Sequence, residues 1–498
     1  MANLILEQQP KYDPFPVTQP VIFTVSDSTV VANQFQVKFI ANVYVHNEIS
    51  SIASYKVATL KTTPNNVGVG MFDLNSILES YVNADNLPTG NSTSTAPTWA
   101  GSVTYKAVPY GFNNQFPIHL VDKFCMNNNS VKWLTIKFEV EYLGADTTNP
   151  NIVATDGDFL WTPNYLFYNG YLTHTDALQG STYSNNFGWD LENAGTDIVG
   201  NELNFIQNSS SASYLSTMPT TLYARKTDYG TIATFTGLTN ASWETGSTGD
   251  QARRYLKTSF KMYDSSDSLL TSFDTANLTT NGGSGGSITN NSNTKFVFFG
   301  AYPANLNNWS TNFQTHIDDT SYYTVQGFDM SSNAITKLYT VNIICANGFG
   351  YEGIRLAWLN KFGAWDYYTF NTKSVRSINT KKTEYTQLDG SWNEGFYNPF
   401  GFKGGRKNFN LNATERIKLS TNFLRDTQSV WIEELMNSPE VYIINESTAN
   451  DNGGIINKYV EPVIVSSSSF TRKTVANDKL FAYTIDVERT KKLRTQAV

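Results

Sequence analysis

The strongest constraint on the fold is the alternation of polar and apolar residues along Trp133–Tyr142. Charged residues at positions 137, 139 and 141 alternate there with apolar residues at positions 136, 138, 140 and 142. Successive side chains of a β-strand point to opposite faces, so this period of two predicts a half-buried strand. Phe35–Val45 begins with the same alternation. Long amphipathic segments rich in Glu, Lys and Arg are nearly absent, so we expect a mainly β protein with a few short helices.

Short segments of strand type recur along the chain between turns rich in Gly, Asn and Ser, and they suggest three domains. We expect an N-terminal β-sandwich of roughly immunoglobulin size over 1–165, in which Asp73 caps one short helix. A central β-rich domain is expected over 166–385, and a C-terminal α+β assembly domain over 386–498. Further predicted strands are Val21–Val25, Tyr55–Lys61, Val103–Val108, Thr231–Phe235, Leu256–Tyr263, Lys295–Phe299, Tyr322–Phe328, Lys337–Cys345, Val441–Ile444 and Val460–Val465.

The composition bounds the classes of partner. Charged residues make up 16% of the chain and aromatic residues 14%, whereas a disordered chain is rich in charge and poor in aromatics. The formal net charge of −7 argues against a surface that binds duplex nucleic acid. The first 20 residues lack the pattern of a secretory signal, and no apolar run approaches the length of a membrane helix. We therefore expect a soluble protein, made in a cytoplasm, that neither enters membranes nor binds nucleic acid.

The sequence contains no pattern that supports catalysis, so we expect a protein that is not an enzyme and that binds no cofactor and no metal. None of the four histidines lies within four residues of another histidine or of a cysteine, and no known metal-binding pattern occurs. Gly282–Gly286 matches the letters of a nucleophile elbow, but it lies in a flexible Gly/Ser run. Three carboxylate pairs are expected to be ordinary turn or helix residues: Asp156 with Asp158, Asp318 with Asp319, and Glu433 with Glu434. Cys125 and Cys345 adjoin apolar runs, which predicts two buried, reduced thiols.

The densest aromatic segment is Leu356–Phe370, which reads as two strands joined by a turn at Asn360–Gly363. Its aromatic side chains have three open roles: packing in the core, contact between subunits, or stacking on sugars. The residues that we consider as interface candidates are Trp358, Trp365, Tyr367 and Tyr368.

The C-terminal segment supplies the other interface candidates. We expect a short helix that Asp426 or Thr427 caps and Pro439 ends, with Trp431 and Leu435 on one contact ridge. A strand follows over Leu480–Val487, whose apolar face should pack inward. The chain then carries the basic residues Arg489, Lys491, Lys492 and Arg494, which form either a solvated terminus or a tail that docks on an acidic neighbour.

Several of these stretches also resemble uncharacterised tail and baseplate structural proteins of bacteriophages and prophages that infect Bacteroidota. The resemblance lies in QPVIFTV from Gln19, GMFDLNSILESYV from Gly70, RLAWLNKFGAWDYYTF from Arg355, WIEELMNSPEVY from Trp431, SFTRK from Ser469 and DKLFAYTI from Asp478. It carries no catalytic residues and leaves the central region unmatched.

The resemblance implies a structural component of a virion tail: a part of the baseplate, a tail-end adaptor or the base of a receptor-binding apparatus. Because tails are built around an axis, we expect a closed homo-oligomer, a trimer or a hexamer, in contact with other tail proteins. The alternatives are a receptor-binding protein that grips a host surface glycan, and a head decoration or fibre protein. In the receptor-binding alternative, aromatic loops make the contact with the glycan. A glycan depolymerase is a further alternative, although no carboxylate pair supports it.

Overall fold

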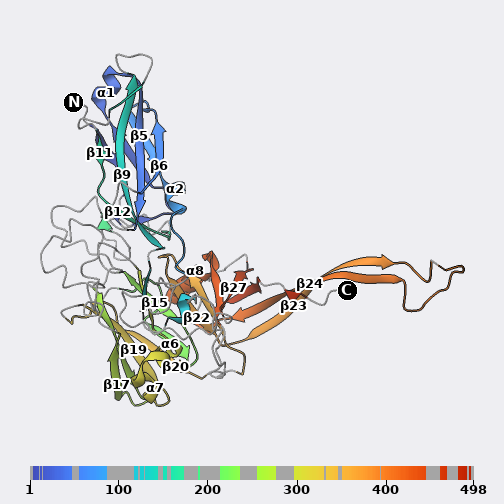
Figure 1. The fold of residues 1–498 in the computed structure, drawn as a ribbon. Helices are drawn as coiled ribbons and strands as arrows, with labels where there is room; N and C mark the ends of the chain where they lie inside the picture. The colour runs from blue at the N-terminus through green and yellow to red at the C-terminus, as the bar shows by residue number, and fades with distance from the viewer. Residues whose placement is uncertain are drawn as a thin grey trace. The chain divides into compact units, whose positions relative to one another are not determined.

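The protein is mainly β, with several sheets and a few short helices, as the sequence predicts (Figure 1). The structure is a computed structural model. It describes residues 4–10, 12–13, 15–47, 55–86, 117–121, 124–127, 129–143, 150–153, 159–172, 189–190, 213–235, 255–275, 296–329, 332–345, 350–392, 394–444, 460–467, 480–490 and 493–494. By its internal contacts the chain forms two compact units, which are described separately. Unit 1 comprises Met1–Ile344, Leu359–Asp366 and Thr448–Asn457, and unit 2 comprises Cys345–Trp358, Tyr367–Ser447 and Lys458–Val498.

A β-sandwich occupies the N-terminal part of unit 1. One sheet has the order β1-β4-β7, and the other has the order β3-β12-β9-β5-β6, with β10 and β11 also paired to β9. The strands are β1 (Ile5–Gln8), β3 (Phe15–Pro16), β4 (Ile22–Ser26), β5 (Phe35–His46), β6 (Lys56–Thr62), β7 (Val69–Asp73), β9 (Val131–Leu143), β10 (Pro150–Val153), β11 (Leu160–Trp161) and β12 (Tyr165–Tyr168). The predicted strands at Phe35–Val45 and Trp133–Tyr142 are therefore confirmed.

The core of the sandwich is aromatic and forms between the inner faces of the two sheets. Phe138 of β9 packs against Phe23 of β4 and Phe72 of β7, with ring centroids 6.3 and 5.7 Å apart. The opposite face of β9 is covered too, which corrects the expectation of a half-buried strand. Glu139 and Glu141 are only 9% and 5% exposed. They tolerate burial because Asn42 donates to Glu139 at 2.7 Å and a lysine of β6 pairs with Glu141.

Two helices border the sandwich. α1 (Ser28–Asn33) begins at Asp27, whose carboxylate accepts from the N–H of Val30 at 2.9 Å. α2 (Asn75–Glu79) lies where a short helix is predicted, but Leu74 rather than Asp73 occupies its N-cap position. The Asp73 carboxylate accepts from the N–H of Asn75 at 3.1 Å and also from Val21, so it links the helix to the start of β4.

The central part of unit 1 contains a five-stranded sheet of order β14-β20-β19-β16-β17 and a three-stranded sheet of order β15-β18-β8, besides the pair β13-β2. The strands are β2 (Tyr12–Asp13), β8 (Phe124–Asn127), β13 (Trp189–Asp190), β14 (Thr221–Arg225), β15 (Thr231–Phe235), β16 (Tyr255–Tyr263), β17 (Leu269–Asp274), β18 (Phe296–Gly300), β19 (Tyr322–Asp329) and β20 (Tyr339–Ile344). The turn η2 (Ile118–Leu120) and the helices α6 (Pro303–Trp309) and α7 (Thr311–His316) complete it. These strands confirm the predictions made for this region, and Val103–Val108 lies outside the described residues.

Unit 2 is built on one large sheet of order β22-β21-β26-β27-β29-β24-β23, with β30 also paired to β24. Its strands are β21 (Ile354–Leu359), β22 (Trp365–Phe370), β23 (Ser374–Gln387), β24 (Gly405–Ser420), β26 (Val441–Ile444), β27 (Val460–Val465), β29 (Thr484–Arg489) and β30 (Leu493–Arg494). β25 (Leu424–Arg425) pairs with β28 (Leu480–Phe481), and β25 leads directly into α8 (Asp426–Asn437).

The expectations for the end of unit 2 hold in part. α8 ends before Pro439, as predicted, but its N-cap residue is Arg425, whose N–H donates to Gln428 Oε1 at 2.9 Å. The predicted strand Leu480–Val487 is divided into β28 and β29, and its apolar face is buried as expected: Phe481, Tyr483, Ile485 and Val487 are at most 8% exposed. The three-domain division drawn from the sequence stays a prediction. Its boundary at 385/386 falls within β23.

Candidate assembly interface

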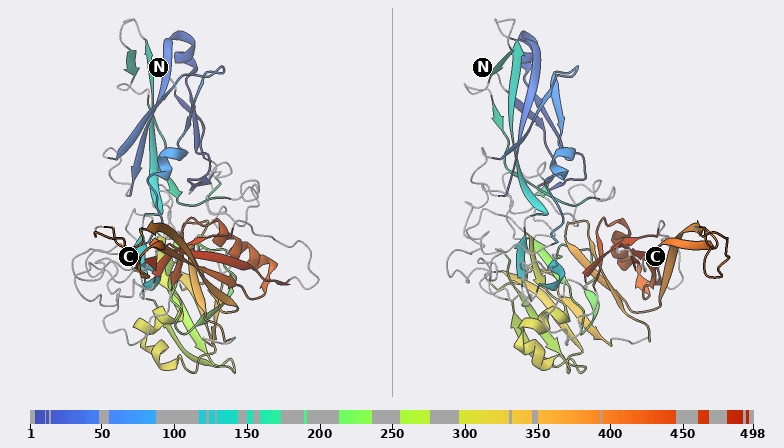
Figure 2. Two further views of the ribbon diagram at one scale, coloured as in Figure 1. Left: turned by 90° about the vertical axis from the view of Figure 1, so that its right-hand side faces the viewer. Right: turned by 45° about the vertical axis from the view of Figure 1, so that its right-hand side comes forward.

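The arm is a two-stranded ribbon, residues 374–420, that extends from the sheet of unit 2. β23 and β24 pair antiparallel along their full lengths. Near the base, β24 also pairs with β29, and at Asn412 and Ala413 it pairs with β30. Among the described residues, β24 has no partner except β23 from Leu411 outward, and Figures 1 and 2 show the two strands leaving the rest of their sheet together. The arm therefore projects strand surface that its own unit does not cover.

The sequence of the arm favours extended backbone without favouring burial. β23 is rich in Thr and other β-branched residues, which suit strands, yet almost all of its side chains are exposed. β23 is also the edge strand of the sheet. Lys381 and Lys382 lie on this edge, and the register shifts between Thr383 and Glu384. Lysines and bulges of this kind discourage the pairing of one edge strand with another.

Hydrogen bonds around Ser391 order the arm tip, which comprises the described residues 388–392 and 394–404. The Ser391 N–H donates to the Asn398 carbonyl at 2.9 Å, and its hydroxyl accepts from the Asn398 N–H at 3.0 Å. Gly390 has φ +62°, and a Cβ there would lie 2.5 Å from the Asn398 carbonyl oxygen. The loop therefore needs glycine at this position to close. At the other side of the tip, the Lys403 backbone N–H donates to the Phe400 carbonyl oxygen at 3.0 Å.

The arm tip and the strand beside it carry exposed apolar side chains. Five aromatic residues are between 64% and 86% exposed, and Leu388 is 71% exposed. The aromatic residues are Trp392, Phe396, Tyr397, Phe402 and Phe409. Fully burying one such side chain is worth roughly 1.5–3 kcal/mol, so this surface gains considerably from a partner. Clustered exposed apolar residues of this kind mark interaction sites.

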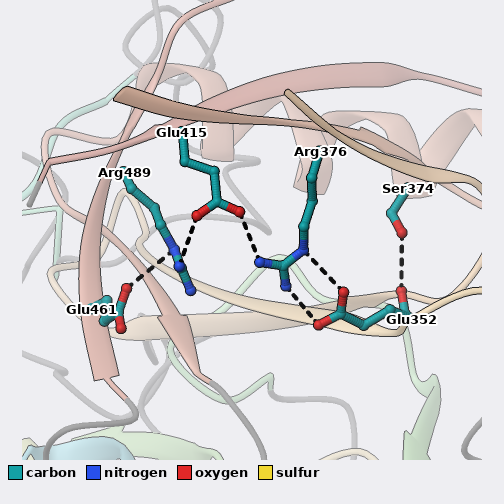
Figure 3. A network of polar contacts seen from close by, with 6 residues as sticks. All are labelled: Glu352, Ser374, Arg376, Glu415, Glu461 and Arg489. Carbon is teal, nitrogen blue, oxygen red and sulfur yellow. Dashed lines mark hydrogen bonds and ion pairs between the residues drawn. The ribbon is translucent and has the colours of Figure 1, made fainter. Parts of the chain in front are cut away.

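A network of ion pairs fixes the base of the arm (Figure 3). The Glu415 carboxylate of β24 lies between two guanidinium groups: Arg376 Nη1 donates to it at 2.8 Å and Arg489 Nη1 at 2.9 Å. Arg376 also donates to both carboxylate oxygens of Glu352, at 3.0 and 2.6 Å. Arg489 Nε lies 3.2 Å from Glu461 Oε2. The network thus crosses the sheet from β23 through β24 and β29 to β27.

The exposure of these side chains indicates how strongly their ion pairs restrain the base of the arm. The Glu415 side chain is 10% exposed, whereas that of Arg376 is 36% exposed. Burial alone lowers the pKa of Arg376, but hydrogen bonds to Glu352 and Glu415 outweigh it and raise that pKa above its ordinary value. A nearly buried carboxylate that accepts from two planar cations resists rotation, so the network orients the arm where it leaves the sheet.

The charge of the arm differs in sign from that of the remaining chain. Residues 374–420 contain eight Lys and Arg and four Asp and Glu, a net charge of +4. The remaining residues contain 28 Lys and Arg and 39 Asp and Glu, a net charge of −11. Electrostatic steering can therefore draw the arm of one copy towards the body of another copy.

The aromatic residues that the sequence singled out lie elsewhere, in the interior of their own units. Trp358, Trp365 and Tyr367 are at most 3% exposed, and so are Trp431 and Leu435 of α8. The Trp431 ring centroid lies 5.2 Å from that of Trp358 and 5.8 Å from that of Tyr368. Burial raises the pKa of Tyr368 to about 12. Of the three roles left open, these positions favour core packing.

The basic C-terminal residues divide into two groups. Arg489 is part of β29 and contacts Glu415 and Glu461 of its own chain. Arg494 belongs to β30, which pairs with β24 opposite Asn412, while Lys491 and Lys492 lie outside the described residues. Arg489 therefore has a place in the sheet, and the docking role of the residues beyond it stays a prediction.

The described residues include His, Cys, Asp and Glu side chains. No group of three or more His, Cys, Asp or Glu that could hold a metal ion occurs among them. Cys345 is a free thiol, but it is exposed, which corrects the prediction that it is buried. It directly follows β20, so the apolar run before it ends at the sheet and leaves the thiol outside. Cys125 lies in β8, and its side chain is outside the described set. No described helix is long and apolar enough to cross a membrane.

Sequence reasoning missed the arm. The segment Asn393–Gly405 reads as a loop rich in glycine and aromatic residues, and its flanks, 374–387 and 406–420, lack a continuous apolar alternation. One available signal was the pairing of two segments rich in Thr, Asn and Lys on either side of that loop, since two β-prone runs around a glycine-containing loop predict a hairpin.

Comparison with known proteins gives no family. No protein-family model matches the chain, and no curated protein matches it. Among solved structures, the native α-2-macroglobulin of E. coli is similar over 83% of this chain and 21% of that one, with 8% identity and a TM-score of 0.18. The Salmonella α-2-macroglobulin that has reacted with methylamine gives 97% and 23% coverage, 7% identity and a TM-score of 0.18. The BSP domain of a biofilm-associated protein gives 83% and 62% coverage, 11% identity and a TM-score of 0.15. The chain thus spans less than a quarter of the two macroglobulin chains, and similarities this low carry no argument about function.

Proposed function

We propose that the chain is a structural component of a bacteriophage tail, in the baseplate, the tail-end adaptor or the base of the receptor-binding apparatus. It acts through symmetric protein–protein assembly rather than through catalysis, with other copies of itself and other tail proteins as partners. Its sequence resembles tail and baseplate proteins, and its mainly β architecture suits a rigid building block.

The arm is the observation that carries this proposal. A single chain gains nothing from exposing to water four aromatic side chains at the end of an ordered ribbon and a fifth, Phe409, on the strand beside it. Aromatic residues are enriched in the buried centres of protein interfaces, and those of the arm tip lie where a neighbour can cover them. Subunits that reach across to one another suit a closed cyclic ring, of three or six copies here.

Labelling of virions tests this function. Virions of the phage that encodes this chain are decorated with an antibody fragment against it and imaged by electron microscopy. We expect label at the tail in a three-fold or six-fold arrangement. Label on the head would instead support the decoration or fibre alternative. A virion without label, or with one unpaired copy, would contradict the proposal.

A second candidate function is recognition of a host surface glycan by the arm tip. Trp392 and Tyr397 are exposed aromatic residues on an ordered loop, and such rings can stack on the apolar faces of sugars. A glycan array probed with the intact protein and with Trp392→Ser separates the two functions. Binding that disappears in the variant favours recognition, and the absence of binding by the intact protein rejects it.

A further inference from the structure

We propose that the arm tip of one copy docks on the body of a second copy, so that the contact runs from arm to body and not from arm to arm. Here the body means the residues outside 374–420. The inference rests on the proposed function for its setting, since it names the surface and the partner through which the subunits assemble. Four features of the arm lead to it.

The first feature is the size of the apolar surface. An aromatic side chain buries roughly 150–250 Å² when it is covered, so the four exposed ones at the arm tip, together with Phe409 of β24 beside it, offer an area on the order of 700 Å². A standard stable interface buries about 800 Å² on each partner. The arm tip therefore approaches a full interface by itself, and polar contacts from the flanking strands supply the remainder.

The second feature is charge, which selects the partner. The arm carries +4 and the rest of the chain −11. The tip itself carries −1, so the positive charge beside the contact lies on the flanking strands, at Lys381, Lys382, Arg406 and Lys407, and a second copy of this chain presents the complementary charge to these residues. Two arms carry the same sign, and juxtaposed like charges oppose association. An arm that meets a body is consequently favoured over an arm that meets an arm. Such a heterologous contact closes into a ring when the rotation between successive copies allows it.

The third feature determines which part of the arm makes the contact. Both edges of the distal ribbon offer free backbone groups. Lys381 and Lys382 on β23, Arg406 and Lys407 on β24, and the register shift between Thr383 and Glu384 oppose the addition of another strand. The arm tip has no such defence, and its hydrogen bonds around Ser391 hold the loop while its aromatic side chains face solvent. The side chains of the tip therefore make the contact.

The fourth feature is the fixed base. Glu415 between Arg376 and Arg489 limits the directions in which the arm can leave its sheet. A projection that is already oriented loses less conformational freedom on binding than a flexible one. The base network thereby contributes to affinity although it lies outside the contact itself.

A cross-linking experiment between two kinds of full chain tests the proposal. The donor carries the photoreactive residue p-benzoylphenylalanine in place of Phe396. The acceptor has residues 382–411 replaced by Asn-Gly, a pair that closes two-residue hairpins, and keeps Arg376 and Glu415. The acceptor also carries an affinity tag. Irradiation of the mixture should give a donor–acceptor product whose cross-linked peptide lies outside 374–420.

Three results would overturn the proposal. One is the absence of donor–acceptor product while the acceptor keeps its folded circular-dichroism spectrum and thermal transition. A second is product only between two donors joined through their arms. The third, in virions that carry the photoreactive residue, is cross-linking only to a different virion protein. We expect the yield of the supported product to fall as salt is raised, because the contact joins opposite charges.

Point variants give a quantitative test. Trp392→Ser combined with Phe402→Ser removes two tip aromatics and should weaken self-association about a hundredfold, measured by sedimentation over a series of concentrations. Phe423→Ser is the matched control, since Phe423 is 73% exposed but lies outside the arm, and it should leave association within about twofold. Equal effects of the two changes would contradict the proposal.

The outcomes separate this inference from the proposed function. Virion label at the tail, with no arm-to-body product, would leave the tail function in place and remove the arm as its contact. Arm-to-body product, with label elsewhere on the virion, would keep the arm as the contact between copies and contradict the tail function.

Discussion

β9 of the sandwich and β24 of the arm are both long strands, of 13 and 16 residues, yet their surroundings are opposite. Both faces of β9 are largely buried, so that even Glu139 and Glu141 lie inside. The distal part of β24 is exposed on both faces, and Phe409 there is 69% exposed. The sequence of a strand thus favours its extended backbone, whereas the neighbouring elements determine which of its side chains are exposed to solvent.

The polar residues of β9 and the apolar residues of the arm are the informative exceptions. Glu139 and Glu141 find partners within the chain, in Asn42, Lys61 and Lys137. The aromatic residues of the arm tip remain mostly exposed within the chain. An unusual residue that is satisfied internally indicates a structural role, and one that is not indicates a partner outside the chain.

The largest predicted effect contrasts a buried with an exposed phenylalanine. Phe138→Ala removes a fully buried ring that contacts Phe23 and Phe72, so it should lower the free energy of unfolding by about 3–5 kcal/mol. Phe396→Ala removes a ring that is 86% exposed and should change that free energy by less than about 0.5 kcal/mol. Urea titrations of both variants measure the difference. Similar losses of unfolding free energy in the two variants would contradict the contrast between the buried strand β9 and the exposed arm.

The second prediction concerns a carboxylate buried in unit 1. Burial raises the pKa of Asp85 to about 7, although the Asn129 N–H donates to it at 3.1 Å. Because its folded-state pKa exceeds its unfolded-state value of 3.8, the stability that this group contributes is complete below about pH 4 and is lost as pH rises through about 7. The loss is at most about 4 kcal/mol.

Asp85→Asn should remove this pH dependence, because the amide does not ionise. We expect the variant to melt several degrees above the unaltered protein at pH 8, and the two melting temperatures to converge towards pH 4. Thermal unfolding followed by circular dichroism at both pH values provides the measurement. If the two melting temperatures differed by the same amount at pH 4 and pH 8, Asp85 would not ionise in this range.

The third prediction concerns the backbone of the arm tip. Gly390→Ala places a side chain at φ +62° and 2.5 Å from the Asn398 carbonyl, so it should destabilise the ordered loop by about 1–2 kcal/mol. Gly395→Ala is the matched control, since a Cβ there meets nothing within 4 Å. Hydrogen exchange of peptides spanning 388–404 should be faster in the first variant alone. Equal exchange in both would mean that the loop does not need this glycine.

The smallest effect is expected at the base of the arm. Glu415→Gln removes the charge that two arginines share and should cost about 1 kcal/mol, because the pairs are only partly buried. Glu488→Gln removes one exposed pair, with Arg416, and should cost less than about 0.5 kcal/mol. Faster hydrogen exchange in β23 of the first variant only is the expected readout, and it should shrink in high salt.

Much of the architecture could be predicted from the sequence, because burial imposes a period. The start of Phe35–Val45, Trp133–Tyr142 and Leu480–Val487 all show one. The hairpin around Asn360–Gly363 was predictable from its turn instead, since nearly every residue of β21 and β22 is buried. These segments place apolar residues against a core, and that requirement is visible in a single chain. α8 was predictable for the same reason, together with the stop at Pro439.

The arm could not be predicted in this way, since a ribbon exposed on both faces has no core to impose a pattern. β23 contains Val375 and Ile378, but both are at least 45% exposed and no apolar series connects them. The same limit explains Cys345, whose apolar neighbours lie in β20 while the thiol lies one residue beyond it. Features that serve a partner outside the chain leave a weaker trace in the sequence than those that serve its own interior.

The position of β29 has a consequence for how the chain is completed during synthesis. β29 is an interior strand of the unit 2 sheet, paired on one side with β27 and on the other with β24, yet it is synthesised after both of them. Until Thr484–Arg489 emerges, the hairpin of β23 and β24 can form from local contacts but cannot join β27. A chain released before Thr484–Arg489 is made would therefore have a formed hairpin and no join between the two parts of that sheet, so only chains that include β29 can present the arm on a complete sheet.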